Sequence, residues 1–185
     1  MSRRIVAVAV ALTLSMAACG GDAVARALTA DEQAFADSMA TRFSAEADAG
    51  EPLAGDDAAA CLAEGLVREF GMDRLVEFGV GESGTDAFLA MTDDELDTVA
   101  AVAFGCPQFS TFLVAEMSAD GLSAASAECL VGEMIESGVA RELLAADIRG
   151  ESMDAVLADP TNQGILIGAM LKCFTAEERE QLLGG

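Results

Sequence analysis

The five cysteines have the most reactive side chains in this chain: Cys19, Cys61, Cys106, Cys129 and Cys173. A thiol can carry a lipid, close a disulfide or ligate a metal. A tetrahedral thiolate site typically uses close Cys-x-x-Cys pairs, and the sequence contains none. We therefore expect no metal site and no cofactor, and we expect the cysteines to act through lipidation and disulfides.

The remaining composition removes several kinds of chemistry. The 185 residues include no His, Trp or Tyr, which excludes histidine zinc sites and both the Ser-His-Asp and Cys-His nucleophile arrangements. A net charge of −22 excludes a nucleic-acid interface built on basic patches. A pair of carboxylates is the machinery of glycoside hydrolysis, but any two of the 32 acids qualify. We predict no catalytic residues and no enzymatic activity.

Two short motifs match the sequence patterns of ligand-binding sites, but a structural role explains each of them better. Residues 79–84 spell G-x-G-x-x-G, which binds dinucleotides only between a strand and a helix. A helical pattern precedes them and Glu82 would repel phosphates, so we predict a flexible loop. The acidic run 92–97 lacks the alternate spacing and the central Gly of a calcium loop. We interpret it, like Asp56 and Asp57, as the first turn of a helix, where acids favour the helix dipole.

The first eighteen residues have the organisation of an export signal. Arg3 and Arg4 precede the uncharged stretch 5–18, which is shorter than the roughly 20 apolar residues of a membrane-spanning helix. The small residues Ala17 and Ala18 lie at its end, as they do before a cleavage site. The sequence therefore predicts a signal peptide over 1–18.

The end of this signal resembles the lipobox of bacterial lipoproteins, usually Leu-Ala-Gly/Ala-Cys, because residues 16–19 read Met-Ala-Ala-Cys. The resemblance implies a diacylglycerol on the Cys19 sulfur and cleavage that leaves Cys19 as the new N-terminus. It predicts a protein attached by lipid to the extracytoplasmic face of the cell membrane, with 19–28 as the tether. The alternative is a secreted protein cut after Ala18, in which Cys19 is a plain thiol.

The charge of the exported part is strongly negative. Beyond Ala18 the chain carries eight bases against 32 acids, a formal charge of −24. Such a surface repels anionic lipid headgroups and nucleic-acid phosphates, and it suits a domain that stands off the membrane. A basic protein partner is compatible with the same charge.

Four cysteines remain after Cys19, and in an exported protein they predict two disulfides with three pairings open. An internal repeat favours Cys61–Cys106 and Cys129–Cys173, since each bridge then lies within one unit. Residues 61–62, 66–67 and 75–76 fall on residues of the same kind, cysteine or apolar, 68 positions later, and the apolar residues 99–100 and 103–104 fall on apolar residues 67 positions later. Each bridge closes a loop of similar length and adds about 4 kcal/mol of stability.

The local signals are helical. Thr29, Thr92 and Thr175 each precede a Glu by three positions, as in a capping box, and Asp159 precedes a Pro. We predict an all-α fold of two tandem disulfide-pinned helical repeats plus an N-terminal helix. One compact domain over 29–185 would comprise the helix in 29–50, repeat 1 at 53–120 and repeat 2 at 121–185. We expect helices near 30–48, 56–70, 72–78, 93–105, 108–118, 124–137, 139–146, 152–157, 160–173 and 176–183.

Phe and Met residues recur through both repeats, and their default role is to fill the core. They can also line a cavity for an apolar ligand, a pattern loosely similar to the saposin-like proteins, which have six Cys. We therefore expect a non-catalytic binding or structural module with a protein partner, and as the alternative a carrier of an apolar ligand or lipid. The residues considered for the cavity are Phe70, Phe78, Phe88, Phe104, Phe109, Phe112, Met72, Met91, Met117, Met134 and Met170.

Overall fold

The computed structural model describes residues 26–80 and 84–183, and all regular secondary structure in these ranges is helical. The all-α class is confirmed, and each predicted helix is present with ends close to the expected ones. The 3-10 helices η1 and η2 were not predicted. The elements are α1 (Ala30–Glu46), η1 (Pro52–Ala54), α2 (Asp56–Phe70), α3 (Met72–Phe78), η2 (Gly84–Ala90), α5 (Asp93–Gly105), α6 (Pro107–Ala119), α7 (Ala124–Ser137), α8 (Val139–Ile148), α9 (Met153–Ala158), α10 (Pro160–Cys173) and α11 (Ala176–Leu183).

The predicted caps define where the helices begin and end. Thr29 and Thr92 each accept a hydrogen bond from the backbone N–H three residues on, and the Glu carboxylate at that position accepts one from the Thr backbone N–H. Asp159 accepts from two N–H groups at the start of α10. Gly79 and Gly138 end α3 and α7 with φ of 84° and 88°, the left-handed conformation that favours glycine. The centre of the predicted 79–84 loop lies outside the described residues.

The first half of the chain has its own apolar core. Met39 and Phe43 of α1 pack with Leu62 and Leu66 of α2, positions that recur three or four apart as on one helix face. The Phe43 and Phe88 rings lie 6.0 Å apart between centroids. Full burial of such side chains stabilises by roughly 1.5–3 kcal/mol each. This core therefore joins α1, α2, α3, η2 and α5.

A second, smaller core lies between α7, α8 and α10. Leu130, Met134, Val139 and Ala169 are buried in it. The buried Asn162 is also satisfied, because its side-chain amide donates to a Glu142 carboxylate oxygen at 2.7 Å and to the Val156 carbonyl at 3.2 Å. This one polar side chain ties α10 to α8 and α9.

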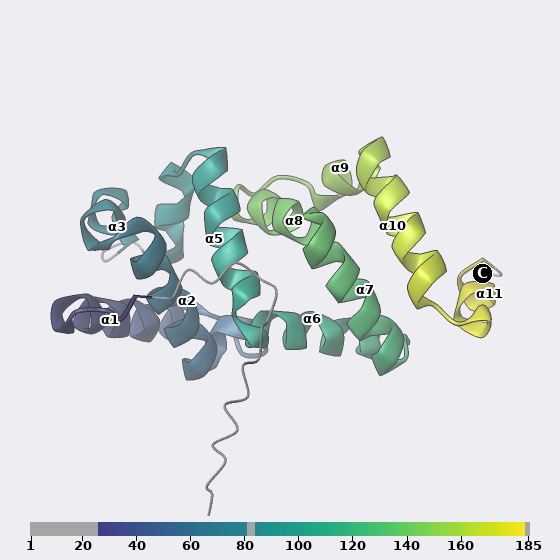
Figure 1. Ribbon diagram of the computed structural model, residues 1–185, viewed down its shortest axis with the longest axis horizontal. Helices are drawn as coiled ribbons and strands as arrows, with labels where there is room; N and C mark the ends of the chain where they lie inside the picture. Colours follow the sequence, from purple (N-terminus) through teal and green to yellow (C-terminus); the bar gives the residue numbers. More distant parts are fainter. Residues whose placement is uncertain (1–25, 81–83, 184–185) are drawn as a thin grey trace, which may run out of the picture.

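The two halves meet where α5 packs against α8. Ala145 of α8 is buried in the first core, and Leu144 and Ile148 pack against it. Arg149, just after α8, donates to the Asp93 carboxylate at the start of α5 at 2.8 Å. The halves follow one another along the long axis, with α1 and α3 toward one end and α10 and α11 at the other (Figure 1).

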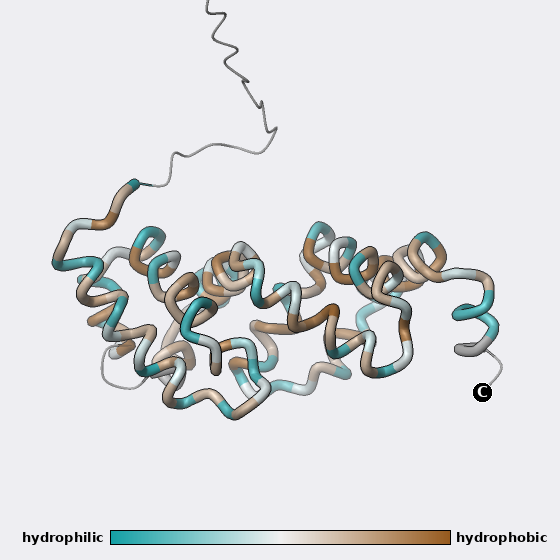
Figure 2. The backbone as a smooth tube through the Cα atoms, turned by 90° about the horizontal axis from the view of Figure 1, so that it is seen from below, coloured by the Kyte–Doolittle hydropathy of each residue, from teal (hydrophilic) through white to brown (hydrophobic). Residues whose placement is uncertain are grey.

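The last helix of the described chain is polar. α11 is mostly hydrophilic and lies at the C-terminal extreme (Figure 2). Within the described ranges, no single helix has the length and apolar composition to cross a membrane. Only α5 and α6 taken together reach that length and composition, and the chain bends by 80° between these two helices.

Candidate functional site

The first disulfide joins the core of α2 to the end of α5. Cys61 and Cys106 are bonded, with 5.9 Å between their Cα atoms, and Cys106 is 1% exposed. One turn further along α2, Gly65 faces Val102 of α5 so closely that a Cβ atom on Gly65 would lie 2.3 Å from Val102 Cγ1. A residue without a side chain is therefore needed here, and the sequence pattern did not single out Gly65.

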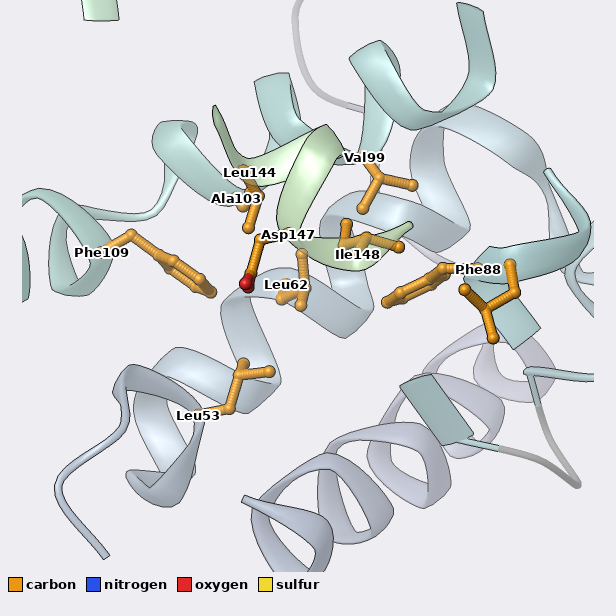
Figure 3. Close-up of a pocket in the computed structure, with 10 residues that line it drawn as sticks. Leu53, Leu62, Phe88, Val99, Ala103, Phe109, Leu144, Asp147 and Ile148 are labelled. Carbon is orange, nitrogen blue, oxygen red and sulfur yellow. The ribbon is translucent and has the colours of Figure 1, made fainter. Parts of the chain in front are cut away.

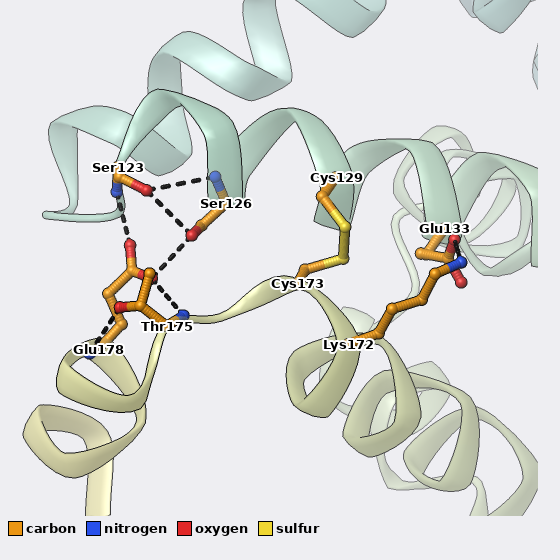
Figure 4. The surroundings of a disulfide bond; sticks show 8 residues. All are labelled: Ser123, Ser126, Cys129, Glu133, Lys172, Cys173, Thr175 and Glu178. Atoms are coloured by element: carbon orange, nitrogen blue, oxygen red, sulfur yellow. Dashed lines mark hydrogen bonds and ion pairs between the residues drawn. A yellow bond between two sulfur atoms is a disulfide. The ribbon is translucent and has the colours of Figure 1, made fainter.

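The second disulfide makes the corresponding link in the other half. Cys129 of α7 and Cys173 at the end of α10 are bonded, with 5.4 Å between their Cα atoms. Lys172 forms an ion pair with Glu133 one turn along α7 (Figure 4). Both pairs match the pairing that the sequence favours, and each bridge connects an early helix of its half to a later one.

Glu178 is the most heavily bonded carboxylate beside this bridge. It accepts from the Ser126 hydroxyl at 2.7 Å, the Ser123 backbone N–H at 2.9 Å and the Thr175 backbone N–H at 2.8 Å (Figure 4). These donors, the Ser126 hydroxyl first, hold the pKa of Glu178 far below its ordinary value. The predicted capping box of α11 is confirmed, and the same carboxylate fastens α11 to the start of α7.

The other carboxylates with lowered pKa values also cap helices. Arg26 and the Thr29 N–H lower the pKa of Glu32 to about 2. Arg74, followed by the Thr92 N–H, lowers the pKa of Glu95 to about 2. A general acid needs a pKa raised toward neutrality, and these shifts run the other way. The acidic run 92–97 thus has the structural role that the sequence predicted.

An apolar pocket of about 270 Å³ lies at the junction of the two halves. Phe88 and Phe109 approach it from opposite sides, and the Asp147 carboxylate points into the space between them (Figure 3). The lining combines η1, α2, η2, α5, α6 and α8, so both halves build it. Its residues are Leu53, Leu62, Phe88, Leu89, Val99, Ala103, Phe109, Leu144, Asp147 and Ile148.

Only two of the Phe and Met residues considered for a cavity line this pocket, namely Phe88 and Phe109. Phe70 and Phe78 instead pack edge to face with ring centroids 6.2 Å apart. The remainder are divided between the two cores or lie partly exposed, including Met91 in the first core and Phe104, Met117, Met134 and Met170 in or against the second. The two cores divide most of the set, which agrees with the default role of filling the core.

The other candidate sites can be placed briefly. Across the described part of the chain, no group of three His, Cys, Asp or Glu residues is placed to hold a metal ion. Cys19, the predicted lipidation site, lies outside the described residues. Asp56 and Asp57 lie in the first turn of α2, as interpreted from the sequence.

Comparisons with models of protein families, with curated proteins and with solved structures found no match to the chain.

Proposed function

We propose that this protein is a non-catalytic binding or structural module, anchored by lipid on Cys19 to the extracytoplasmic face of the cell membrane and built from two tandem helical repeats. The observation that carries the repeat is the recurrence of one packing order in both halves, and the resemblance of residues 16–19 to a lipobox supports the anchor. In each half, the helix that carries the first cysteine of the disulfide packs on the helix that ends at the second cysteine. These pairs are α2 with α5 and α7 with α10.

Further pairs support the repeat. α2 packs with α3 as α7 packs with α8, and α3 packs with η2 as α8 packs with α9. α1 packs on α2, and α6 packs on α7 in the same way. The units are then best divided as α1 to α5 and α6 to α10, with α11 as the counterpart of α6. This division moves α6 out of repeat 1 as delimited at 53–120.

A non-catalytic role is supported by what the polar groups do. The carboxylates with lowered pKa values close capping boxes, and the pocket at the junction has Asp147 as its one charged lining residue. Glycoside hydrolysis, the carboxylate-pair chemistry considered from the sequence, needs a second carboxylate beside the first. Helical repeat domains commonly act instead through extended surfaces that bind partners.

Anchoring is tested with an alkyne fatty acid fed to cells that express the full chain. The wild-type protein should incorporate the label and sediment with membranes, and Cys19→Ser should lose both properties. Two acyl chains give stable attachment where one does not. Label retained by Cys19→Ser, or soluble unlabelled wild-type protein, contradicts the proposal.

The second candidate is a carrier of a small apolar molecule, favoured by the pocket between Phe88 and Phe109. Its volume of about 270 Å³ is just below the roughly 300–1,000 Å³ typical of ligand pockets, so it suits a compact ligand better than a whole membrane lipid. Opposed aromatic faces and aliphatic walls supply dispersion contacts for such a molecule.

Native mass spectrometry of protein extracted from membranes separates the two functions. An apolar small molecule bound at fixed stoichiometry supports the carrier, and its loss in Phe109→Ala locates it in the pocket. A co-purifying polypeptide supports the binding module. As a matched control, Phe112→Ala removes a phenyl ring from the same helix, at a position outside the pocket lining.

A further inference from the structure

Large apolar side chains are exposed on two helices toward opposite ends of the molecule. On α10, Ile167 is 54% and Leu171 is 60% exposed, and on α3, Val76 is 57% exposed. α3 and α10 lie toward opposite ends of the long axis (Figure 1). The end units of a helical repeat array ordinarily present polar outer faces, because an apolar end invites association. The apolar side chains at these two ends are therefore exposed where a repeat array ordinarily has polar ones.

The exposed face of α10 corresponds to a buried face inside the chain. In the repeat, Ile167 takes the position of Ala100 and Leu171 takes the position of Phe104 on α5. Ala100 is fully buried, and Phe104 packs against the second core. On α5 this face is covered because α8 of the following unit packs over it. On α10 the two residues stay exposed in the part of the chain that the structure describes.

The exposed face of α3 is the matching half of the same junction. Val76 takes the position of Leu144 on α8, and Glu77 takes that of Ala145. Leu144 packs against the first core, and Ala145 is buried in it, because α5 of the preceding unit covers them. On α3, Val76 stays exposed among the described residues.

We propose that copies of this protein associate head to tail, with α10 of one copy against α3 of the next, in the way that α5 meets α8 within the chain. This inference rests on the repeat proposed above. The exposed face of α10 on one copy is covered by the exposed face of α3 on a second copy. Because the two surfaces differ, the contact is heterologous and adds copies in a row instead of closing a symmetric pair.

The α10 face has the shape for a helix to dock. Gly164 and Gly168 flank Ile167 on this side of α10, and a Cβ atom built on either glycine would meet nothing within 4 Å. Small residues allow two helix backbones to approach closely. The two glycines lie on the same side of α10 as the large side chains Ile167 and Leu171, which are available to contact Val76.

The charge of whole copies opposes the contact. Lys172, beside Leu171 on α10, is already paired with Glu133, and the exposed Asp73 and Glu77 flank Val76 on α3, so the borders of the two faces are not opposite in net sign. The exported part carries a formal charge of −24, so copies repel, and association should strengthen as salt shortens the Debye length below about 10 Å. Attachment to one membrane raises the effective concentration.

α11 limits how far the internal junction can be reproduced. Within the chain, α6 follows α5 and packs on α7 of the next unit. α11 follows α10 in the same way, but on α2, the counterpart of α7, the equivalent surface is already covered by α1. α11 must therefore lie beside α1 of the neighbouring copy. The contact between copies is then confined to α10 and α3, which makes it weaker than the α5–α8 junction.

The test uses full-length chains on vesicles of neutral phosphatidylcholine. One preparation carries Val76→Cys, a second carries Leu171→Cys, and a short bis-maleimide joins thiols that lie close together. Thioether cross-links survive reduction, so native disulfides do not confuse the gel. The mixture should give a cross-linked dimer, and neither preparation alone should. Thr111→Cys, at an exposed position on α6, replaces either partner as the control.

Each outcome decides the proposal. Ile167→Asp in the Leu171→Cys copy should lower the dimer yield about tenfold, the loss expected when an apolar contact becomes a charge. Dimers from either single preparation indicate a symmetric contact and overturn the proposal, as does a mixture that cross-links no better than the Thr111→Cys control. Circular dichroism confirms folding of each variant. Flotation of the vesicles reports lipid anchoring separately, and without anchoring the same mixture is tested at high concentration in solution.

Discussion

Gly65→Ala tests the close approach of α2 and α5 that the first disulfide secures. The added Cβ would lie 2.3 Å from Val102 Cγ1, whereas carbon atoms in favourable contact are about 3.5–4.0 Å apart. Val in a helix strongly prefers one χ1 rotamer, so the methyl group cannot simply rotate away. The helices must separate or Val102 must leave its rotamer.

The magnitude follows from two opposing effects. Overpacking of a core costs about 1–3 kcal/mol. Alanine in place of glycine inside a helix contributes about 1 kcal/mol of stability. Gly132→Ala is the matched control, because Gly132 lies within α7 with open space around its Cβ position. The propensity gain is common to both variants, so Gly65→Ala should be less stable than Gly132→Ala by about 1–3 kcal/mol.

Chemical denaturation of the oxidised protein, followed by circular dichroism, measures both free energies of unfolding. Each kcal/mol also shifts the melting temperature by about 2–4 °C in a chain of this size. In a Val102→Ala background the steric clash disappears, so Gly65→Ala should then stabilise as Gly132→Ala does. Equal stabilisation by Gly65→Ala and Gly132→Ala in the wild-type background would refute the close approach.

Three further results are expected. Cys61→Ser with Cys106→Ser should lower the free energy of unfolding by about 4 kcal/mol, measured by denaturant titration, because a long loop is released. Thr92→Ala should cost about 1 kcal/mol by thermal melting through loss of the α5 cap. The pKa of Glu178 is lower in the folded protein than its ordinary 4.5, so its stabilisation is complete above that pH and is lost as the pH falls below it. The melting temperature of Glu178→Gln should therefore fall less than that of wild type between neutral pH and pH about 3.

Local signals in the sequence were sufficient for the helices. Thr92 and Glu95 form the expected capping box because that motif involves only residues three apart. The cysteine pairing was also predictable, since the repeat carried long-range information that local patterns lack. The sequence did not predict η2, whose apolar residues Ala87 and Phe88 are buried by contacts with distant helices.

The pocket was predicted only in part, for a related reason. Phe88 and Phe109 were among the candidates, but Ile148 and Asp147 enter the lining because α8 packs against α5. Periodicity places a residue on a helix face and does not tell which helix will cover that face. Likewise, the tight fit of Gly65 depends on where α5 lies, which the sequence of α2 does not contain.

The account is tested most directly by mass spectrometry of the protein extracted from membranes and digested without reductant. It predicts a diacylated N-terminal peptide beginning at Cys19, together with two disulfide-linked peptide pairs, Cys61 with Cys106 and Cys129 with Cys173. Peptides linked between the halves, free thiols at these positions, or an unmodified Cys19 would contradict it.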